Sequence, residues 1–123
     1  MKEREKDFLY NRYCKTMELR NDPALIEAYK TVHKKRAAWP EITNGMKEVG
    51  IVDMEIYLLG TRLFMIMDTV ADFDHDQAMA ALARKPRQSE WEAYMSKYQD
   101  SSAEASASQK WQLMECIYKM GDE

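Results

Sequence analysis

The sequence is poor in the residues that mark disulfide-stabilised, metal-binding and membrane proteins. Its two cysteines, Cys14 and Cys116, are far apart and match no metal or redox spacing, so we expect both thiols to be reduced. No apolar run approaches the roughly 18 residues that a membrane-spanning helix needs. The charged residues 1–7 lack the apolar stretch of a signal peptide. These absences predict a cytoplasmic protein with no membrane partner.

An excess of charge of one sign is also lacking. The 18 lysine and arginine residues nearly balance the 21 aspartate and glutamate residues, and the net charge is −3. Because nucleic-acid-binding domains usually carry a clustered basic face, we expect no nucleic-acid partner. What the chain does have is a hydrophobic fraction of 46% over 123 residues, which suits one compact core. We therefore expect a charged leader at residues 1–7 and a single domain at residues 8–120.

Hydropathy patterns predict four strands with helices between them. Strand-forming residues and alternation predict strands at residues 8–19, 51–59, 62–69 and 110–120. Helical spacing predicts helices at about residues 23–35 after Asn21-Asp22, 39–49 before Gly50, and up to 84 after a cap at Asp72 or Asp74. Pro86 interrupts that helix, and Ser89 with Glu92 has the spacing of a capping box for the next one. Residues 100–109 are polar and predict a loop.

The order strand, helices, strand, strand, helices, strand is that of an α+β, ferredoxin-like βαββαβ fold. Such a fold places helices on one face of an antiparallel sheet. The strands are apolar on both faces, and the last one alternates Met114, Cys116, Tyr118 and Met120 with Trp111, Leu113 and Ile117. A monomer would expose this second face, so we expect a homodimer that buries sheet against sheet. The ten methionines are expected in the core or in this seam.

The clearest candidate for chemistry is His33, four residues after Tyr29 on the apolar side of the first helix. Residues at this spacing are neighbours on one helix face, so the imidazole and the phenol should face the sheet together. Histidine titrates near neutral pH and can give or take a proton. The alternative is a core histidine hydrogen-bonded to Tyr29 or to the backbone.

Other polar or aromatic candidates are weaker. His75 lies in Asp74-His75-Asp76, which could ligate a metal but is also ordinary chemistry for a helix N-terminus, and we expect no metal. Trp91 offers a flat apolar surface on which a sugar could stack, or it is a core residue. No glycine-rich phosphate loop and no serine or cysteine nucleophile signature is present.

Taken together, these pieces resemble the L-rhamnose mutarotase family over about residues 11–118. The most specific motif is Tyr29-x-x-x-His33 followed by Trp39-Pro40-Glu41-Ile42. The remaining motifs follow in the family's order: Gly50, Ile56-Tyr57-Leu58, Leu63-Phe64 with Met67, and Trp91 before Tyr94-Met95.

The resemblance implies a dimeric ferredoxin-like α/β barrel that interconverts the anomers of L-rhamnose without cofactor or metal. It implies that His33 transfers protons and that Tyr29 and Trp91 contact the sugar. Two further positions in the predicted substrate site depart from the family. Met54 stands where the family has a sugar-contacting tyrosine, and Glu92 stands where it has a second tryptophan. Two residues are also inserted after His33. The expected substrate is therefore a 6-deoxyhexose, L-rhamnose or L-fucose.

Mutarotation opens the sugar ring and closes it again on the other face of C1. Opening puts a proton on the ring oxygen and removes one from the O1 hydroxyl, so one acid and one base are needed. His33 is the leading acid/base, and the second group is open among Tyr57, Asp68 and Glu92. Two other functions stay open for this fold: a non-catalytic dimeric ligand-binding or regulatory domain, and a monooxygenase-like or haem-handling protein.

Overall fold

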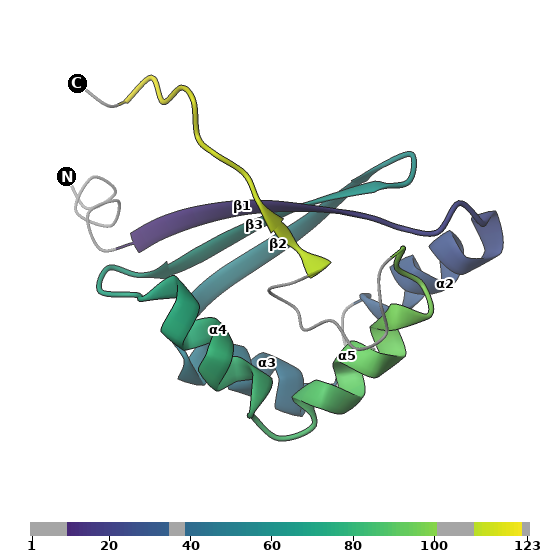
Figure 1. Cartoon of the computed structure of the whole chain (residues 1–123), viewed down its shortest axis with the longest axis horizontal. Coiled ribbons are helices and arrows are strands. Elements are labelled where there is room, and N and C mark those ends of the chain that lie inside the picture. Colours follow the sequence, from purple (N-terminus) through teal and green to yellow (C-terminus); the bar gives the residue numbers. More distant parts are fainter. Residues whose placement is uncertain (1–9, 35–38, 101–109, 122–123) are drawn as a thin grey trace.

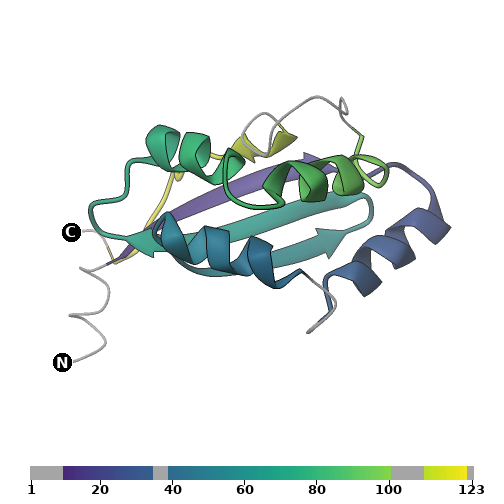
Figure 2. The same ribbon diagram turned by 90° about the horizontal axis from the view of Figure 1, so that it is seen from below.

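The computed structural model describes residues 10–34, 39–100 and 110–121. These residues form one antiparallel sheet with helices on one of its faces (Figures 1 and 2). In chain order, the elements are β1 (Tyr10–Glu18), α2 (Pro23–Val32), α3 (Pro40–Glu48), β2 (Ile51–Leu59), β3 (Arg62–Val70), α4 (His75–Ala83), α5 (Gln88–Ser96) and β4 (Gln112–Leu113). The predicted order of strands and helices is confirmed. The predicted leader and most of the predicted 100–109 loop lie outside the described residues.

The sheet is built around β3 and β1, which lie at its centre in the order β2-β3-β1-β4. β1 pairs with β3 along its whole length, from Tyr10 opposite Val70 to Glu18 opposite Arg62. β2 and β3 form the predicted hairpin, with an irregularity in the pairing at the start of β2. Because side chains alternate along a strand, β1 and β3 present one set of residues to the helices and the other set to the opposite face.

Local capping chemistry explains where the helices begin and end. The Asp22 carboxylate accepts hydrogen bonds from the first turn of α2, and Pro23 occupies the first helical position. Asp74, rather than Asp72, caps α4 through the Gln77 N–H. Gly50 follows α3 with a φ of +105°, a conformation that favours glycine. The predicted starts of α2 and α3 and the predicted ends of α3 and α4 agree with the structure to within a residue, whereas α2 ends at Val32, before its predicted end at about residue 35.

The predicted start of the fourth helix at a Ser89 capping box is wrong. α5 begins at Gln88, and its N-cap is Arg87, which has a φ of 64° and makes no side-chain capping bond. The chain reverses after Pro86 through this left-handed residue, and the Trp91 N–H already donates to the Arg87 carbonyl at 3.0 Å. Ser89 therefore lies inside the first turn, where its side chain cannot cap the helix.

The predicted C-terminal strand at residues 110–120 is also mostly wrong. Only Gln112–Leu113 form β4, pairing with Thr16 and Lys15 of β1. After one more backbone hydrogen bond, from Met114 N to Cys14 O at 2.8 Å, the chain leaves the sheet (Figure 1). Ile117 is 89% exposed and Met120 80% exposed. Alternation alone cannot make a strand where no neighbouring strand supplies hydrogen bonds.

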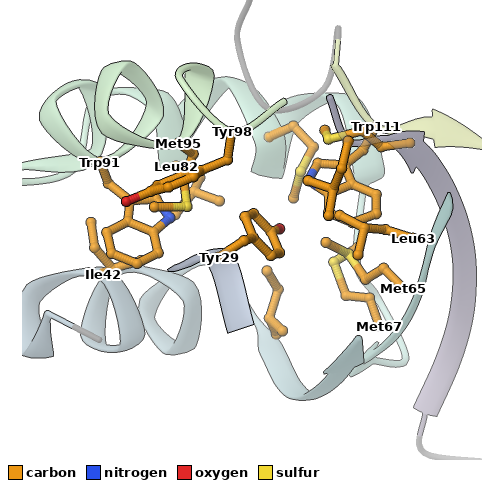
Figure 3. Close-up of a cluster of buried hydrophobic side chains, with 14 of the residues drawn as sticks. Tyr29, Ile42, Leu63, Met65, Met67, Leu82, Trp91, Met95, Tyr98 and Trp111 are labelled. Carbon is orange, nitrogen blue, oxygen red and sulfur yellow. The ribbon is translucent and has the colours of Figure 1, made fainter. Parts of the chain in front are cut away.

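The core lies between the sheet and the helices. Methionines fill much of this core, as the sequence predicted for methionines that do not lie in a dimer seam. The buried ones are Met17, Met65, Met67, Met79 and Met95. Figure 3 shows Tyr29 between the helix side chains, such as Trp91 and Met95, and the β3 side chains Met65 and Met67. The described helices are all too short or too polar to cross a membrane.

Candidate active site

A cavity of about 140 Å³ lies between the helices and the inner face of the sheet. Most of its lining is apolar, and its polar side chains include Lys15, Tyr29, His33, Gln88, Glu92 and Gln99. The five residues singled out from the sequence all line it: His33, Tyr29, Met54, Trp91 and Glu92. They come from α2, β2 and α5, so the fold brings together residues that are up to 63 positions apart in the sequence.

His33 caps the C-terminal end of α2, and its ring is half-buried at the cavity. Its Nδ1 lies 2.8 Å from the backbone carbonyl oxygen of Tyr29. A carbonyl only accepts, so Nδ1 carries a proton and donates it to this bond. In the neutral ring, Nε2 then has a free lone pair. Burial lowers the pKa of His33 and so favours this neutral form. The hydrogen bond to the Tyr29 carbonyl opposes that shift.

The hydrogen bond between Nδ1 and the backbone is the one expected for a core histidine, but His33 also lines the cavity, and no described residue occupies its Nε2. Tyr29 packs against the imidazole, with ring centroids 4.2 Å apart, as their spacing on the helix predicted. The edge of Trp91 lies against the same imidazole at 5.7 Å. Burial raises the pKa of Tyr29, so its hydroxyl stays protonated and is a donor at neutral pH. Trp91 is both a core residue and a cavity wall.

Glu92 is held at the cavity by two neighbours. Gln88, one turn earlier on α5, donates from Nε2 to Glu92 Oε2 at 2.6 Å. Lys110 Nζ lies 3.7 Å from Glu92 Oε1 and donates to the Glu92 backbone carbonyl at 2.8 Å and to Ser96 Oγ at 2.7 Å. Burial raises the pKa of Glu92, while Gln88 and Lys110 oppose that shift. The result is a carboxyl group whose protonated form survives to higher pH than usual.

Two of the three candidates for the second proton-transfer group are on the wrong face of the sheet. Tyr57 is 54% exposed, and its hydroxyl donates to Glu55 at 2.9 Å. Asp68 pairs with Arg12 at 2.7 Å across the strands β1 and β3. Both side chains point away from the helices, because their strand neighbours on the inner face are the buried ones. Glu92 alone of the three lines the cavity.

Three polar cavity residues were not foreseen from the sequence, namely Lys15, Gln88 and Gln99. Neither was Lys110, which supports Glu92. Lys15 carried a signal, because it interrupts the inward-facing series Tyr13, Met17 and Leu19 with a charge. Lys110 carried none, since it comes from a distant part of the chain.

The Asp74-His75-Asp76 segment lies outside the cavity lining. Asp74 caps α4, and His75 Nδ1 lies 3.0 Å from Asp76 Oδ1. The part of the chain that the structure describes contains no group of three histidine, cysteine, aspartate or glutamate side chains arranged to hold a metal ion. The capping interpretation thus accounts for Asp74.

Comparisons with known proteins bear on this arrangement. The sequence profile of the L-rhamnose mutarotase family matches residues 12–120. The chain is 32% identical over 111 residues to an L-fucose mutarotase of Xanthomonas campestris pv. campestris, covering 90% of this chain and 89% of that protein. It is 35% identical over 117 residues to a UPF0734 protein of Dictyostelium discoideum, covering 90% of each.

The fold is also found among solved structures. The crystal structure of an L-rhamnose mutarotase from Formosa agariphila matches with a TM-score of 0.66 at 19% identity, covering 89% of this chain and 98% of the other. At that identity the match concerns the fold, whereas the profile and the bacterial relative concern the family. The chain belongs to the L-rhamnose mutarotase family, isomerases that act on carbohydrates.

Proposed function

We propose that the chain interconverts the α and β anomers of a 6-deoxyhexose, L-rhamnose or L-fucose, by acid/base ring opening without a cofactor. The observation that carries the proposal is the imidazole of His33, which lines a small cavity while its Nδ1 is hydrogen-bonded to the Tyr29 carbonyl. Among the described residues, Nε2 has no hydrogen-bond partner, so its lone pair can accept a proton. The family, with one relative named for L-fucose and one named for L-rhamnose, supports the same choice of sugars.

In this mechanism, His33 Nε2 accepts the proton of the O1 hydroxyl while the bond between C1 and the ring oxygen breaks. The ring oxygen takes up a proton as it leaves, and C1 becomes an aldehyde carbon. Rotation about the C1–C2 bond followed by the reverse steps closes the ring on the other face. Glu92 is the proposed donor to the ring oxygen, because its raised pKa keeps part of the carboxyl protonated.

The remaining cavity residues suit binding of the sugar. Tyr29 supplies a hydroxyl donor, and the indole of Trp91 supplies an apolar surface for the C–H groups of the ring. Met54 lies beside Met65 and Met67 in the apolar lining, where the C6 methyl group of a deoxy sugar would be accommodated. A C6 hydroxyl would lose its water there without gaining a partner, although an apolar wall discriminates against a hydroxyl by only about 10²-fold.

The open face of the sheet supports a homodimer. Large apolar side chains are exposed on β2 and along the C-terminal segment: Tyr57, Leu59, Ile117, Tyr118 and Met120. An apolar surface of this kind is uncommon on a monomer. We propose that two copies cover it by packing sheet against sheet. Light scattering at micromolar concentration should give twice the chain mass of 14.5 kDa, and a stable soluble monomer would contradict the dimer.

The test of the function is saturation-transfer NMR of anomeric exchange. L-rhamnose, L-fucose and common hexoses are compared at equal enzyme concentration, and we expect catalysed exchange to be fastest for a 6-deoxyhexose. L-rhamnose and L-fucose differ at C2 and C4, so their ratio reports on the cavity wall. Binding of these sugars with no acceleration of exchange would favour the non-catalytic ligand-binding function instead.

A further inference from the structure

Lys15, at the middle of β1, is a charged cavity residue that the mechanism above does not use. Its side chain lies on the inner face of the sheet, opposite Met65 on β3 and Leu113 on β4, and the residue is only 3% exposed. Within the described residues, the ammonium group has one hydrogen-bond partner, the thioether sulfur of Met79 at 3.7 Å. An ammonium group has three donors and a thioether is a weak acceptor. Lys15 lines the cavity, and two of the three N–H donors of its ammonium group have no acceptor among the described residues.

A buried ammonium group in this condition destabilises the fold. Charge removed from water without strong partners costs several kcal/mol in general. Burial lowers the pKa of Lys15, and the carboxylate that opposes this shift, Asp76, has a fully exposed side chain. At an inward position flanked by Met17 and Tyr13, any apolar residue would serve the core better.

Lys110 is a second buried lysine, and its hydrogen bonds are those expected of a structural residue. Its side chain is also buried, at 1% exposure, but its ammonium donates to two oxygens at 2.8 Å and 2.7 Å and lies near the Glu92 carboxylate. The two buried lysines thus differ in their described partners: Lys110 has oxygen acceptors, and Lys15 has only a thioether sulfur. The hydroxyl oxygens of a ligand in the cavity would supply stronger acceptors to Lys15 than the thioether does.

We propose that Lys15 is a substrate-binding residue, whose ammonium group donates hydrogen bonds to hydroxyl oxygens of the sugar from the sheet side of the cavity. This inference rests on the proposed function and extends it to a residue of the sheet. A charged donor in an apolar cavity makes stronger hydrogen bonds than a neutral one. Lys15 on β1 and His33 on α2 would then hold the sugar between the two layers of the fold. Glu92 in the same cavity favours a neutral sugar over an acidic one.

The test is Lys15→Met, with Lys110→Met as the matched buried lysine. We measure anomeric exchange against sugar concentration, together with the unfolding temperature of the full chain. Loss of a hydrogen bond from a charged group should raise KM by about 10- to 100-fold with a smaller change in kcat. The unfolding temperature should stay or rise for Lys15→Met, because an unsatisfied charge is removed. It should fall for Lys110→Met, because Ser96 and the Glu92 carbonyl lose their partner.

Two results would overturn the proposal: a folded Lys15→Met with unchanged KM, or a Lys15→Met that unfolds at lower temperature, which would make the lysine structural. The unmodified protein provides a measurement that needs no variant. Its Lys15 side-chain NMR signal should shift when the sugar is added, and no shift would also contradict binding. If the parent binds sugar with no acceleration of exchange, and Lys15→Met weakens that binding measured by sugar titration, the enzymatic function fails while the role of Lys15 stands.

Discussion

The two faces of one sheet differ in how they treat charge. On the outer face, Arg12 pairs with Asp68 at 2.7 Å and Arg62 with Glu18 at 2.8 Å, in contact with water. On the inner face, Lys15 is buried beside methionines, and no carboxylate of the described residues forms an ion pair with it. These charges come from the same strands and are separated only by the alternation of side chains. Paired, hydrated charges contribute little to stability, whereas the buried Lys15 is the charge that we propose to bind the sugar.

Among substitutions of cavity residues, His33→Ala should have the largest effect on the rate of anomeric exchange. If His33 transfers protons, we expect the rate of anomeric exchange to fall by about 10²-fold or more. The fold should survive, because water can fill the space at the cavity. Exchange is measured by NMR and unfolding by circular dichroism, and together they separate a catalytic role from a core role. If His33 were only a core residue, the variant would lose about 0.5–3 kcal/mol of unfolding free energy and its folded fraction would turn over at the parent rate.

The pH dependence of the parent protein follows from the same residue. The pKa of His33 is lowered by burial, so in the folded state the neutral base persists below pH 6.5 and exchange should decline only as the pH falls through that lower pKa. Between the two pKa values the unfolded chain binds more protons, so stability is full above about pH 6.5 and decreases as the pH falls below it. A rate that declines already above pH 6.5 would point to another base.

Glu92→Gln should have the next largest effect. The substitution keeps the shape and removes the proton donor, and we expect exchange to slow by at least about 10-fold. In the parent, the pKa of Glu92 is raised by burial, so the protonated donor is lost as the pH rises through that pKa, and this limb of the pH–rate profile should disappear in the variant. A variant with the parent's full profile would show that another group, or water, donates to the ring oxygen.

Tyr29→Phe should have a smaller effect, because the ring that packs on His33 remains. We expect a loss of several-fold, of the size of one neutral hydrogen bond at about 0.5–1.5 kcal/mol. An increase confined to KM would mean that the hydroxyl positions the sugar, and a loss in kcat would mean that it relays a proton. Parent-like kinetics would remove Tyr29 from the list of sugar contacts.

The smallest effect should come from the outer face. Arg12→Ala removes an ion pair whose arginine side chain is 64% exposed, and such pairs contribute about 1 kcal/mol or less. Urea unfolding should therefore change little, and anomeric exchange should stay at the parent rate. A large loss of exchange in this variant would mean that the two faces are not independent.

Much of this fold could be predicted from local sequence because its causes act over a few residues. Asp22 and Asp74 cap helices through their own neighbouring N–H groups, and Gly50 ends α3 with a backbone angle that glycine tolerates. Tyr29 and His33 meet because a helix turns once in about 3.6 residues. Met54 and Glu92 were assigned to the site through the family resemblance, and Trp91 was a candidate both from its own chemistry and from that resemblance.

Tertiary structure decided the features that depend on a partner distant in sequence. The C-terminal segment stops being a strand at Leu113, because hydrogen bonds to β1 continue only as far as Cys14. Alternation cannot say which face of a sheet the helices will cover, and this placed Tyr57 and Asp68 away from the cavity. The same choice buried Lys15, for which the described residues supply only a thioether acceptor. Lys110, far along the chain from β1, lies beside Glu92 only because the chain folds back onto α5. Periodicity assigns side chains to faces, but only the packing of layers determines which face excludes water.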